Sequence, residues 1–217
     1  SKYFYKHMKV TPFLNVAVED KVANISIIGD IGYNLRADTY EDYEKNTSEN
    51  IAIELQSIQS LKVETVNVTI ESLGGDVSHA LAIYSMLKNS GATINTFYRG
   101  MNASCATIIG SAASSVENIH MDDTGLLLVH MPMVGDNGNK KDKESAIKNL
   151  EAVQVAIEQA YINIGVSKDG LKDLMERNGG HGEWLTFNQA KEYGFVGQSW
   201  ETQKVMNYSK STFENKG

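Results

Sequence analysis

The chain alternates between strand-like segments rich in β-branched residues and segments with helical periodicity, with glycine-containing turns between them. Residues 63–70 alternate as a half-buried strand does, and residues 77–87 then place apolar side chains on one face of a helix. Residues 92–100 repeat the strand pattern and end at a glycine, and residues 104–114 follow as a short helix of small side chains. Two consecutive strand–helix units predict a parallel sheet covered by helices, which is an α/β fold.

Further segments extend this pattern on both sides. Residues 22–32 are rich in β-branched side chains and stop at glycine, which predicts a first strand, and a helix is expected from about Ser48. The nearly continuous apolar run 125–132 predicts a strand that is buried on both faces. Residues 135–143 are polar and rich in turn formers, which predicts an exposed loop.

The last third of the chain predicts three helices. Apolar side chains recur at spacings of three and four over residues 144–165, which makes this the longest helix. Ser167 suits the N-cap of a second helix that reaches about residue 178. Thr186 and Gln189 have the spacing of a capping box for a third helix, which Gly194 can end in the left-handed conformation.

Length, charge and apolar content restrict the class of protein. The 217 residues suit a single domain, and a net charge of -7 without a block of like charges argues against nucleic acid and anionic membrane surfaces as partners. No apolar run approaches the roughly 20 residues that span a bilayer, and the first ten residues lack the apolar centre of a signal peptide. One cysteine excludes an intrachain disulfide. We therefore expect a soluble, cytoplasmic protein with a frayed polar tail over residues 207–217.

Two strand-to-helix turns carry residues that suit acyl-transfer chemistry. The first turn, residues 72–76, contains Gly75 in a glycine pair that lets the backbone approach a ligand closely, and the second begins a helix at Ser104. Backbone N–H groups at such turns have no helical acceptor, so those of Gly75 and Cys105 could stabilise an oxyanion. A serine hydroxyl needs a base, and His130 at the end of the apolar strand is the candidate.

Each of these features also has an ordinary structural explanation. A glycine pair often forms a simple turn, a serine before a helix is usually an N-cap, and a histidine beside a proline is often packed or solvated. No histidine or cysteine spacing indicates a metal site, no phosphate-binding loop is present, and no cofactor is expected. The order of the candidate residues along the chain is what favours catalysis.

That order resembles the Clp protease proteolytic subunit family of serine peptidases. Four segments carry the resemblance, which spans residues 22–197: ESLGGDVSHALAIYSML, GMNASCATIIGSAAS, LLLVHMP and QAKEYGFVG. It implies a ClpP/crotonase-type fold of repeated β-β-α units, with a core over about residues 22–200 and a protruding handle helix within residues 135–165. It also implies Ser104 as nucleophile, His130 as base, and the N–H groups of Gly75 and Cys105 as the oxyanion hole.

The resemblance further implies an assembly and a substrate class. Members form stacked rings, commonly seven-fold, that enclose the active sites and cleave peptides or unfolded proteins, which a separate AAA+ unfoldase supplies. A phage or prophage branch instead cleaves scaffold and capsid proteins during head maturation. The departures of this sequence at SLGGD, ASC and GEW favour that branch.

The acidic member of the catalytic triad does not follow the family pattern. The family places an acid two residues before an aromatic residue, and here Gly182 occupies that position ahead of Trp184. Glu183 is one residue away, and in an extended segment a shift of one residue reverses the side-chain direction. Asp173 and Glu176 are more distant alternatives.

Two other functions therefore stay open. Crotonase-like acyl-CoA enzymes share this architecture and use two backbone N–H groups as an oxyanion hole, without a serine nucleophile. A catalytically silent ring protein would account for the missing acid.

Overall fold

The computed structural model describes residues 15–17, 21–35, 38–39, 44–135 and 137–200. The predicted polar tail from residue 207 and the first ten residues lie outside the described residues. No helix of these ranges is both long and apolar enough to span a membrane.

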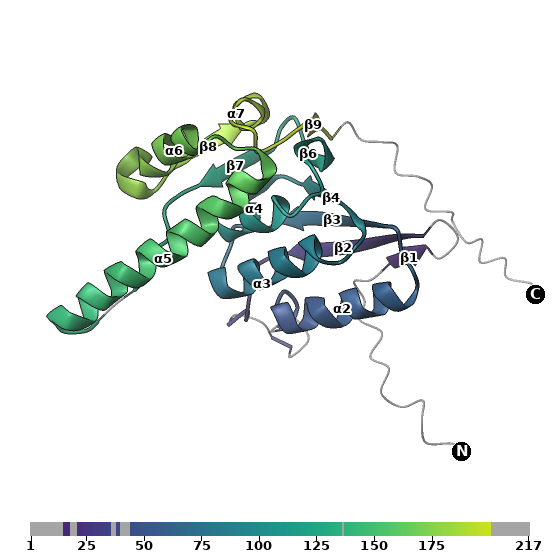
Figure 1. Ribbon diagram of the computed structural model, residues 1–217, viewed down its shortest axis with the longest axis horizontal. Helices are drawn as coiled ribbons and strands as arrows, with labels where there is room; N and C mark the ends of the chain where they lie inside the picture. Colours follow the sequence, from purple (N-terminus) through teal and green to yellow (C-terminus); the bar gives the residue numbers. More distant parts are fainter. Residues whose placement is uncertain (1–14, 18–20, 36–37, 40–43, 136, 201–217) are drawn as a thin grey trace, which may run out of the picture.

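A six-stranded sheet forms the centre of the molecule (Figure 1). In spatial order its strands are β1 (Asn15–Ala17), β2 (Val22–Ile28), β3 (Thr65–Glu71), β4 (Thr93–Tyr98), β6 (Ile119–Met121) and β9 (Gln198–Ser199). All neighbouring strands are parallel except β1, which runs antiparallel to β2. The predicted parallel α/β sheet is therefore present.

Helices cover one face of this sheet (Figure 1). They are α2 (Ser48–Ser60), α3 (Val77–Lys88) and α4 (Cys105–Gly110). A short 3-10 helix, Val116–Asn118, directly precedes β6. Alternate strand residues such as Ile25, Val68 and Ile94 are buried under these helices. Full burial of one such side chain contributes about 1.5–3 kcal/mol, so this layer accounts for much of the stability of the fold.

The opposite face of the sheet carries a row of asparagines. Asn24, Asn67 and Asn95 are register partners on β2, β3 and β4. The amide nitrogens of Asn67 and Asn95 each donate to the asparagine oxygen on the preceding strand, at 3.0 Å from Asn67 to Asn24 and 2.9 Å from Asn95 to Asn67. Asn118 extends the row by donating to Asn95 over 2.7 Å. The side-chain amides thus form a hydrogen-bonded line that crosses the strands.

A smaller sheet lies beside the first. It contains β5 (Met101–Ala103), β7 (Leu126–Val129) and β8 (Glu183–Thr186), with β5 parallel and β8 antiparallel to β7. The apolar run 125–132 does contain a strand, but its side chains alternate between buried and half-buried. The prediction that it is buried on both faces was wrong, because β7 belongs to this partly covered sheet.

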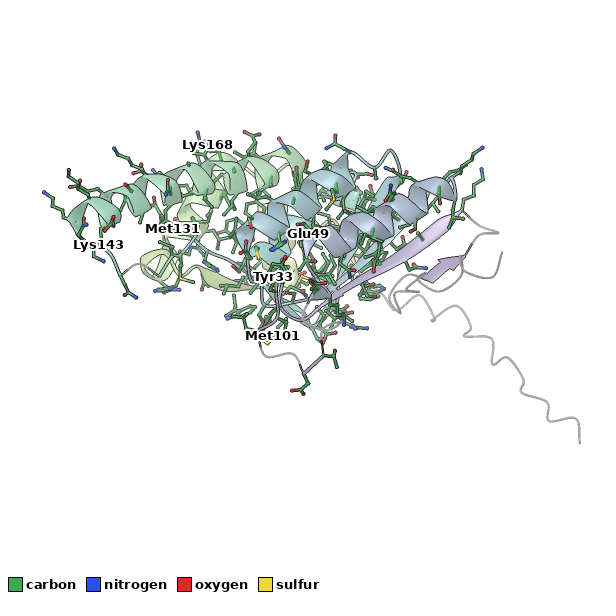
Figure 2. All side chains as sticks on the ribbon, turned by 90° about the horizontal axis from the view of Figure 1, so that it is seen from below. Tyr33, Glu49, Met101, Met131, Lys143 and Lys168 are labelled. Atoms are coloured by element: carbon green, nitrogen blue, oxygen red, sulfur yellow. The ribbon has the colours of Figure 1, made fainter. Side chains whose placement is uncertain are left out.

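The longest helix, α5 (Lys140–Ile164), protrudes from the body of the molecule (Figure 1). Figure 2 shows Lys143 near its free end, well apart from Tyr33 and Glu49. Its C-terminal part is anchored by buried side chains that include Ile157 and Tyr161. The helix begins earlier than predicted, because Asn139 and Asp142 form a capping box that turns the end of the predicted loop into helix.

Two shorter helices follow α5, namely α6 (Lys168–Gly180) and α7 (Phe187–Tyr193). Ser167 caps α6 by accepting from the Gly170 N–H, as predicted. The Gln189 side chain accepts from the Thr186 N–H at 2.9 Å, and Gly194 ends α7 at φ 86°, so the predicted capping box and left-handed end are both present.

Candidate active site

The first strand-to-helix turn holds Gly75 between two main-chain hydrogen bonds. The Ile31 N–H donates to the Gly74 carbonyl and the Asp76 N–H donates to the Ile31 carbonyl, both at 2.9 Å. A Cβ atom on Gly75 would lie 2.2 Å from the Ile31 oxygen, and φ is +150°. Successive peptide groups of an extended segment point to opposite sides, so the Gly75 N–H faces away from Ile31.

Asp76 ends this turn as the N-cap of α3. Its carboxylate accepts from the Ser78 N–H at 2.7 Å and from the His79 N–H at 3.4 Å. A hydrogen bond from the Ser78 hydroxyl is the largest cause that lowers the pKa of Asp76. The cap therefore satisfies the helix terminus, and the carboxylate stays ionised.

The second turn places Ser104 between β5 and α4. Ser104 has φ 57° and ψ −134°, and its side chain makes no capping hydrogen bond. A non-glycine residue with positive φ is strained by about 1–3 kcal/mol, and such strain is concentrated at functional sites. Sharp strained strand-to-helix turns present the nucleophilic serine in α/β-hydrolases. The hydroxyl is thus left available for chemistry instead of serving the helix.

The two turns lie in direct contact. A Cβ atom on Gly74 would be 2.7 Å from the Ser104 Cβ and 3.1 Å from its Oγ. Gly74 therefore makes room for the Ser104 side chain, while Gly75 contributes the N–H that faces away from Ile31.

His130 follows immediately after β7. Its Nδ1 lies 2.6 Å from the Met131 carbonyl oxygen, which can only accept a hydrogen bond. In the neutral ring Nδ1 must therefore carry the proton, and Nε2 is left with a free lone pair. This is the tautomer that a general base requires.

The four predicted residues line one cavity of about 110 Å³. Its walls are Gly75, Val77, Ser104, Cys105, Ile108, His130, Pro132, Met133, Ile157 and Tyr161. Among the hydrogen bonds of the described residues, none joins the Ser104 hydroxyl to His130. Catalytic hydrogen bonds of this type are often long in unliganded enzymes and shorten when substrate binds.

The two N–H groups of the predicted oxyanion hole border this cavity. Cys105 is the first residue of α4, and neither its N–H nor that of Gly75 donates to a main-chain carbonyl among the described residues. Burial raises the pKa of the Cys105 thiol to about 12, an effect that the Gly75 N–H only partly offsets. That contact puts the Gly75 N–H on the side of α4, and the neutral, buried thiol is not a competing nucleophile.

Among the described residues, no hydrogen bond or ion pair joins a carboxylate to His130. β7 and β8 pair Val129 with Glu183, so Gly182 is opposite His130. A Cβ atom on Gly182 would come within 1.9 Å of the Val129 oxygen and 3.2 Å of the His130 Cα. Gly182 therefore packs directly against the main chain at Val129 and His130.

The acidic candidates are bound elsewhere. Glu183 and Asp173 each contact Arg177 at 2.7 Å, and Glu176 pairs with Lys172 at 4.0 Å. The structure does not bring Glu183 to His130. The Met131 carbonyl takes the orienting position instead, and no sequence signal could have indicated it, because every residue carries such a carbonyl.

A groove of about 430 Å³ continues from the cavity toward α5. It shares Gly75, Val77, Pro132 and Met133 with the cavity and adds Asp76, Val134, Gly135, Ala146, Asn149, Leu150 and Val153. Met133 and Val134 are 65% and 57% exposed, so the groove presents apolar side chains to solvent. A larger hollow of about 780 Å³ lies by Phe97 and Trp200, away from Ser104.

Two of the other histidines have structural contacts, and His181 is the exposed C-cap residue of α6. His79 Nδ1 accepts from the Ser48 N–H at 3.1 Å, and His120 stacks on Phe97 with ring centres 4.6 Å apart. His7 lies outside the described residues. Within the described ranges, no group of three or more His, Cys, Asp or Glu side chains is arranged to hold a metal ion.

Comparison with known proteins defines the class. The family model for Clp protease matches residues 25–203, so the chain belongs to the Clp protease family. The predicted resemblance is thereby confirmed, and the match favours a peptidase over the acyl-CoA alternative.

Individual relatives and a solved structure agree with this class. The proteolytic subunit 1 of the ATP-dependent Clp protease of Streptomyces avermitilis is 30% identical over 132 residues, 60% of this chain and 58% of the relative. Subunit 2 of Treponema denticola is 29% identical over 170 residues, 75% of this chain and 80% of the relative. A mutant of ClpP1 from Listeria monocytogenes superposes with a TM-score of 0.68 at 22% identity, over 86% of this chain and 94% of that one. The ClpP/crotonase-type fold is confirmed.

Proposed function

We propose that this chain, as one peptidase domain, is a serine-type endopeptidase. Ser104 is the nucleophile, His130 the general base, and the N–H groups of Gly75 and Cys105 the oxyanion hole. The observation that carries the proposal is the positive φ of Ser104, 57°, together with its hydroxyl, which caps nothing and shares a cavity with a histidine whose Nε2 is unprotonated. A serine that served only to begin a helix would place its oxygen on the helix N–H groups.

The reaction follows from the positions of these groups. His130 Nε2 takes the proton of the Ser104 hydroxyl as Oγ attacks the peptide carbonyl, and the carbonyl electrons move onto oxygen. The Gly75 and Cys105 N–H groups then donate to that oxyanion, each contributing about 3 kcal/mol. The imidazolium returns the proton to the leaving amine, and water attacks the acyl-enzyme by the same steps.

The orientation of His130 by a carbonyl has a consequence for rate. The Met131 oxygen fixes the tautomer at 2.6 Å, but a neutral dipole stabilises the imidazolium less than a carboxylate does. Loss of the aspartate from a triad lowers kcat about 10⁴-fold when the tautomer is lost with it. We expect a slower peptidase than one with a complete triad, with part of that loss avoided because the tautomer is kept.

The groove beside the cavity supports an extended, apolar peptide as substrate. Met133 and Val134 from the segment after β7 and Leu150 from α5 line it. A chain lying there passes Gly75 and reaches Ser104 where the groove joins the smaller cavity. We propose cleavage after small apolar residues, since the cavity measures about 110 Å³.

A ring assembly completes the proposal. Ile147 and Val155 on the protruding part of α5 are 56% and 66% exposed, which suits contact with another copy of this chain. The relatives named above are proteolytic subunits of ATP-dependent proteases, so a separate unfoldase is proposed as partner. Capsid and scaffold proteins stay the alternative substrates of the phage-branch prediction.

A catalytically silent ring protein is the second candidate. Gly182 at the position of the family's acid favours it, because Glu183 and Asp173, the acidic candidates near it, pair with Arg177 and not with His130. Reactivity of Ser104 separates this candidate from the first.

A fluorophosphonate probe tests the nucleophile directly. We expect the wild-type protein to be labelled and mass mapping to place the label on Ser104. The Ser104→Ala variant should not react, and the His130→Ala variant should react at least 100-fold more slowly because the base is gone. Labelling that persists in Ser104→Ala would move the nucleophile elsewhere, and no labelling of wild type would favour the silent protein.

A further inference from the structure

We infer that Thr107 and Tyr161 are positioning residues for the oxyanion hole, acting through the peptide unit that joins Ser104 to Cys105. The inference rests on the proposed function and adds two residues to it. Neither side chain attacks or protonates substrate.

The Ser104–Cys105 peptide is held from one side. The Ser104 carbonyl accepts from the Thr107 N–H at 3.0 Å and from the Thr107 hydroxyl at 2.6 Å. A trans peptide is planar, and its C=O and N–H point in opposite directions. Holding the Ser104 oxygen toward Thr107 therefore aims the Cys105 N–H the other way, at the cavity where the oxyanion would form.

The direction of the next hydrogen bond follows from counting protons. The Thr107 hydroxyl has one hydrogen, and the Ser104 carbonyl, which can only accept, receives it. The Tyr161 hydroxyl lies 2.7 Å from the Thr107 Oγ1, so Tyr161 donates to it. The chain runs from Tyr161 to Thr107 to the Ser104 carbonyl, and each donor polarises the next.

The side chains of this hydrogen-bonded series are buried. Thr107 is 0% exposed and Tyr161 is 2% exposed. The Tyr161 ring stacks edge-on against Phe195, with centres 5.3 Å apart. Burial also raises the pKa of Tyr161, so its hydroxyl remains a neutral donor at physiological pH.

Strain at Ser104 explains why such support is needed. A non-glycine residue at φ 57° persists only where its surroundings over-determine it. One support is the Ser104 N–H, which donates to the Leu128 carbonyl at 2.9 Å. The hydrogen bonds from Tyr161 to Thr107 and from Thr107 to the Ser104 carbonyl hold the carbonyl end of the same residue.

The test removes single hydroxyls and separates kcat from KM. We expect Tyr161→Phe and Thr107→Val to lower kcat for an apolar peptide about 10- to 100-fold, because a misaimed oxyanion donor is weaker. KM should stay within about twofold. Thr107→Ser keeps the hydroxyl and should retain kcat. Thr107 does not line the cavity, so its effect cannot arise from contact with substrate.

Tyr98→Phe is the matched control. Tyr98 is 1% exposed, and its hydroxyl donates to the Thr107 main-chain carbonyl at 3.1 Å. This bond is not part of the series from Tyr161 to the Ser104 carbonyl. We expect Tyr98→Phe to lower stability as Tyr161→Phe does and to leave kcat unchanged. The double variant of Tyr161→Phe and Thr107→Val should be no slower than Thr107→Val alone.

The outcomes distinguish this inference from the proposed function. Unchanged kcat in Tyr161→Phe and Thr107→Val, or an equal fall in Tyr98→Phe, overturns the inference while Ser104 labelling stays intact. If wild type does not react at all, the proposed function fails first. Hydrogen exchange over residues 104–110 then decides: faster exchange in Tyr161→Phe than in Tyr98→Phe supports the positioning role, and equal rates overturn it.

Discussion

The two strand-to-helix turns of the site use their N-cap side chains in opposite ways. At the first turn Asp76 accepts from the N–H groups of α3, and the unusual φ values fall on Gly74 and Gly75. At the second turn Ser104 carries the positive φ itself and caps nothing. One turn is built for stability, and the other accepts strain in order to present a hydroxyl.

The comparison shows that a residue typical of an N-cap can either cap the helix or leave its side chain free of the helix. Asp and Ser are both strong N-cap residues, so sequence alone favours capping at each turn. The backbone conformation distinguishes them: Asp76 is extended and its side chain caps α3, whereas Ser104 has a positive φ and its side chain makes no capping bond.

The largest expected effect is at Gly75 in the first turn. Gly75→Ala should lower the free energy of unfolding by about 3 kcal/mol or more, since its Cβ would lie 2.2 Å from a main-chain oxygen. Gly91→Ala is the matched control, because Gly91 has φ +80° but no atom within 4 Å of an added Cβ. Denaturant melts at one fixed protein concentration measure both. Equal losses would mean that φ, and not the approach of Ile31, decides the first turn.

A smaller effect of opposite sign is expected at Ser104. Ser104→Gly should be about 1 kcal/mol more stable than Ser104→Ala, because glycine relieves the positive φ and alanine does not. Both variants should be inactive toward the probe. Thermal melts of the pair measure the difference. An alanine variant as stable as the glycine variant would show that the second turn is not strained.

The smallest effect is expected at Asp76 and depends on pH. Its folded-state pKa lies below its ordinary value of 3.8, so the ionised cap stabilises the fold above that pH and loses this contribution as pH falls through the lowered pKa. Asp76→Asn keeps an acceptor but not the charge, and should cost about 0.5 kcal/mol at pH 7. The gap between variant and wild type should close as pH falls from 5 toward 2 in melts across that range. A stability difference that did not change with pH would show that the charge of Asp76 does not contribute.

Most elements could be predicted because their patterns are local. The strands β2, β3 and β4 and the helices α3, α5 and α7 follow from alternation, periodicity and caps within each segment. β5 and β8 were missed, because three or four residues without a distinctive pattern gain their strand conformation only by pairing with β7. The assignment of the apolar run to a doubly covered strand failed for the same reason.

The candidate site also contains groups that the sequence predicted and groups that it did not. The candidate nucleophile, base and oxyanion N–H groups were found from their order along the chain. The orienting group of His130 was not, because it is a carbonyl. Tyr161 reads from sequence as one apolar position of α5, and its bond to Thr107 joins residues 54 positions apart.

The asparagine row on the uncovered face fixes the alignment of the central strands. Asn67 gives one amide hydrogen bond to Asn24 and receives another from Asn95. A slip of β3 by one residue would break both bonds at once and turn Asn67 into the apolar layer beneath the helices. Because β3 leads directly into the glycine pair, the same slip would carry Gly75 off its place beside Ser104. The asparagine row therefore fixes the register of β3 and, with it, the position of the glycine pair relative to Ser104.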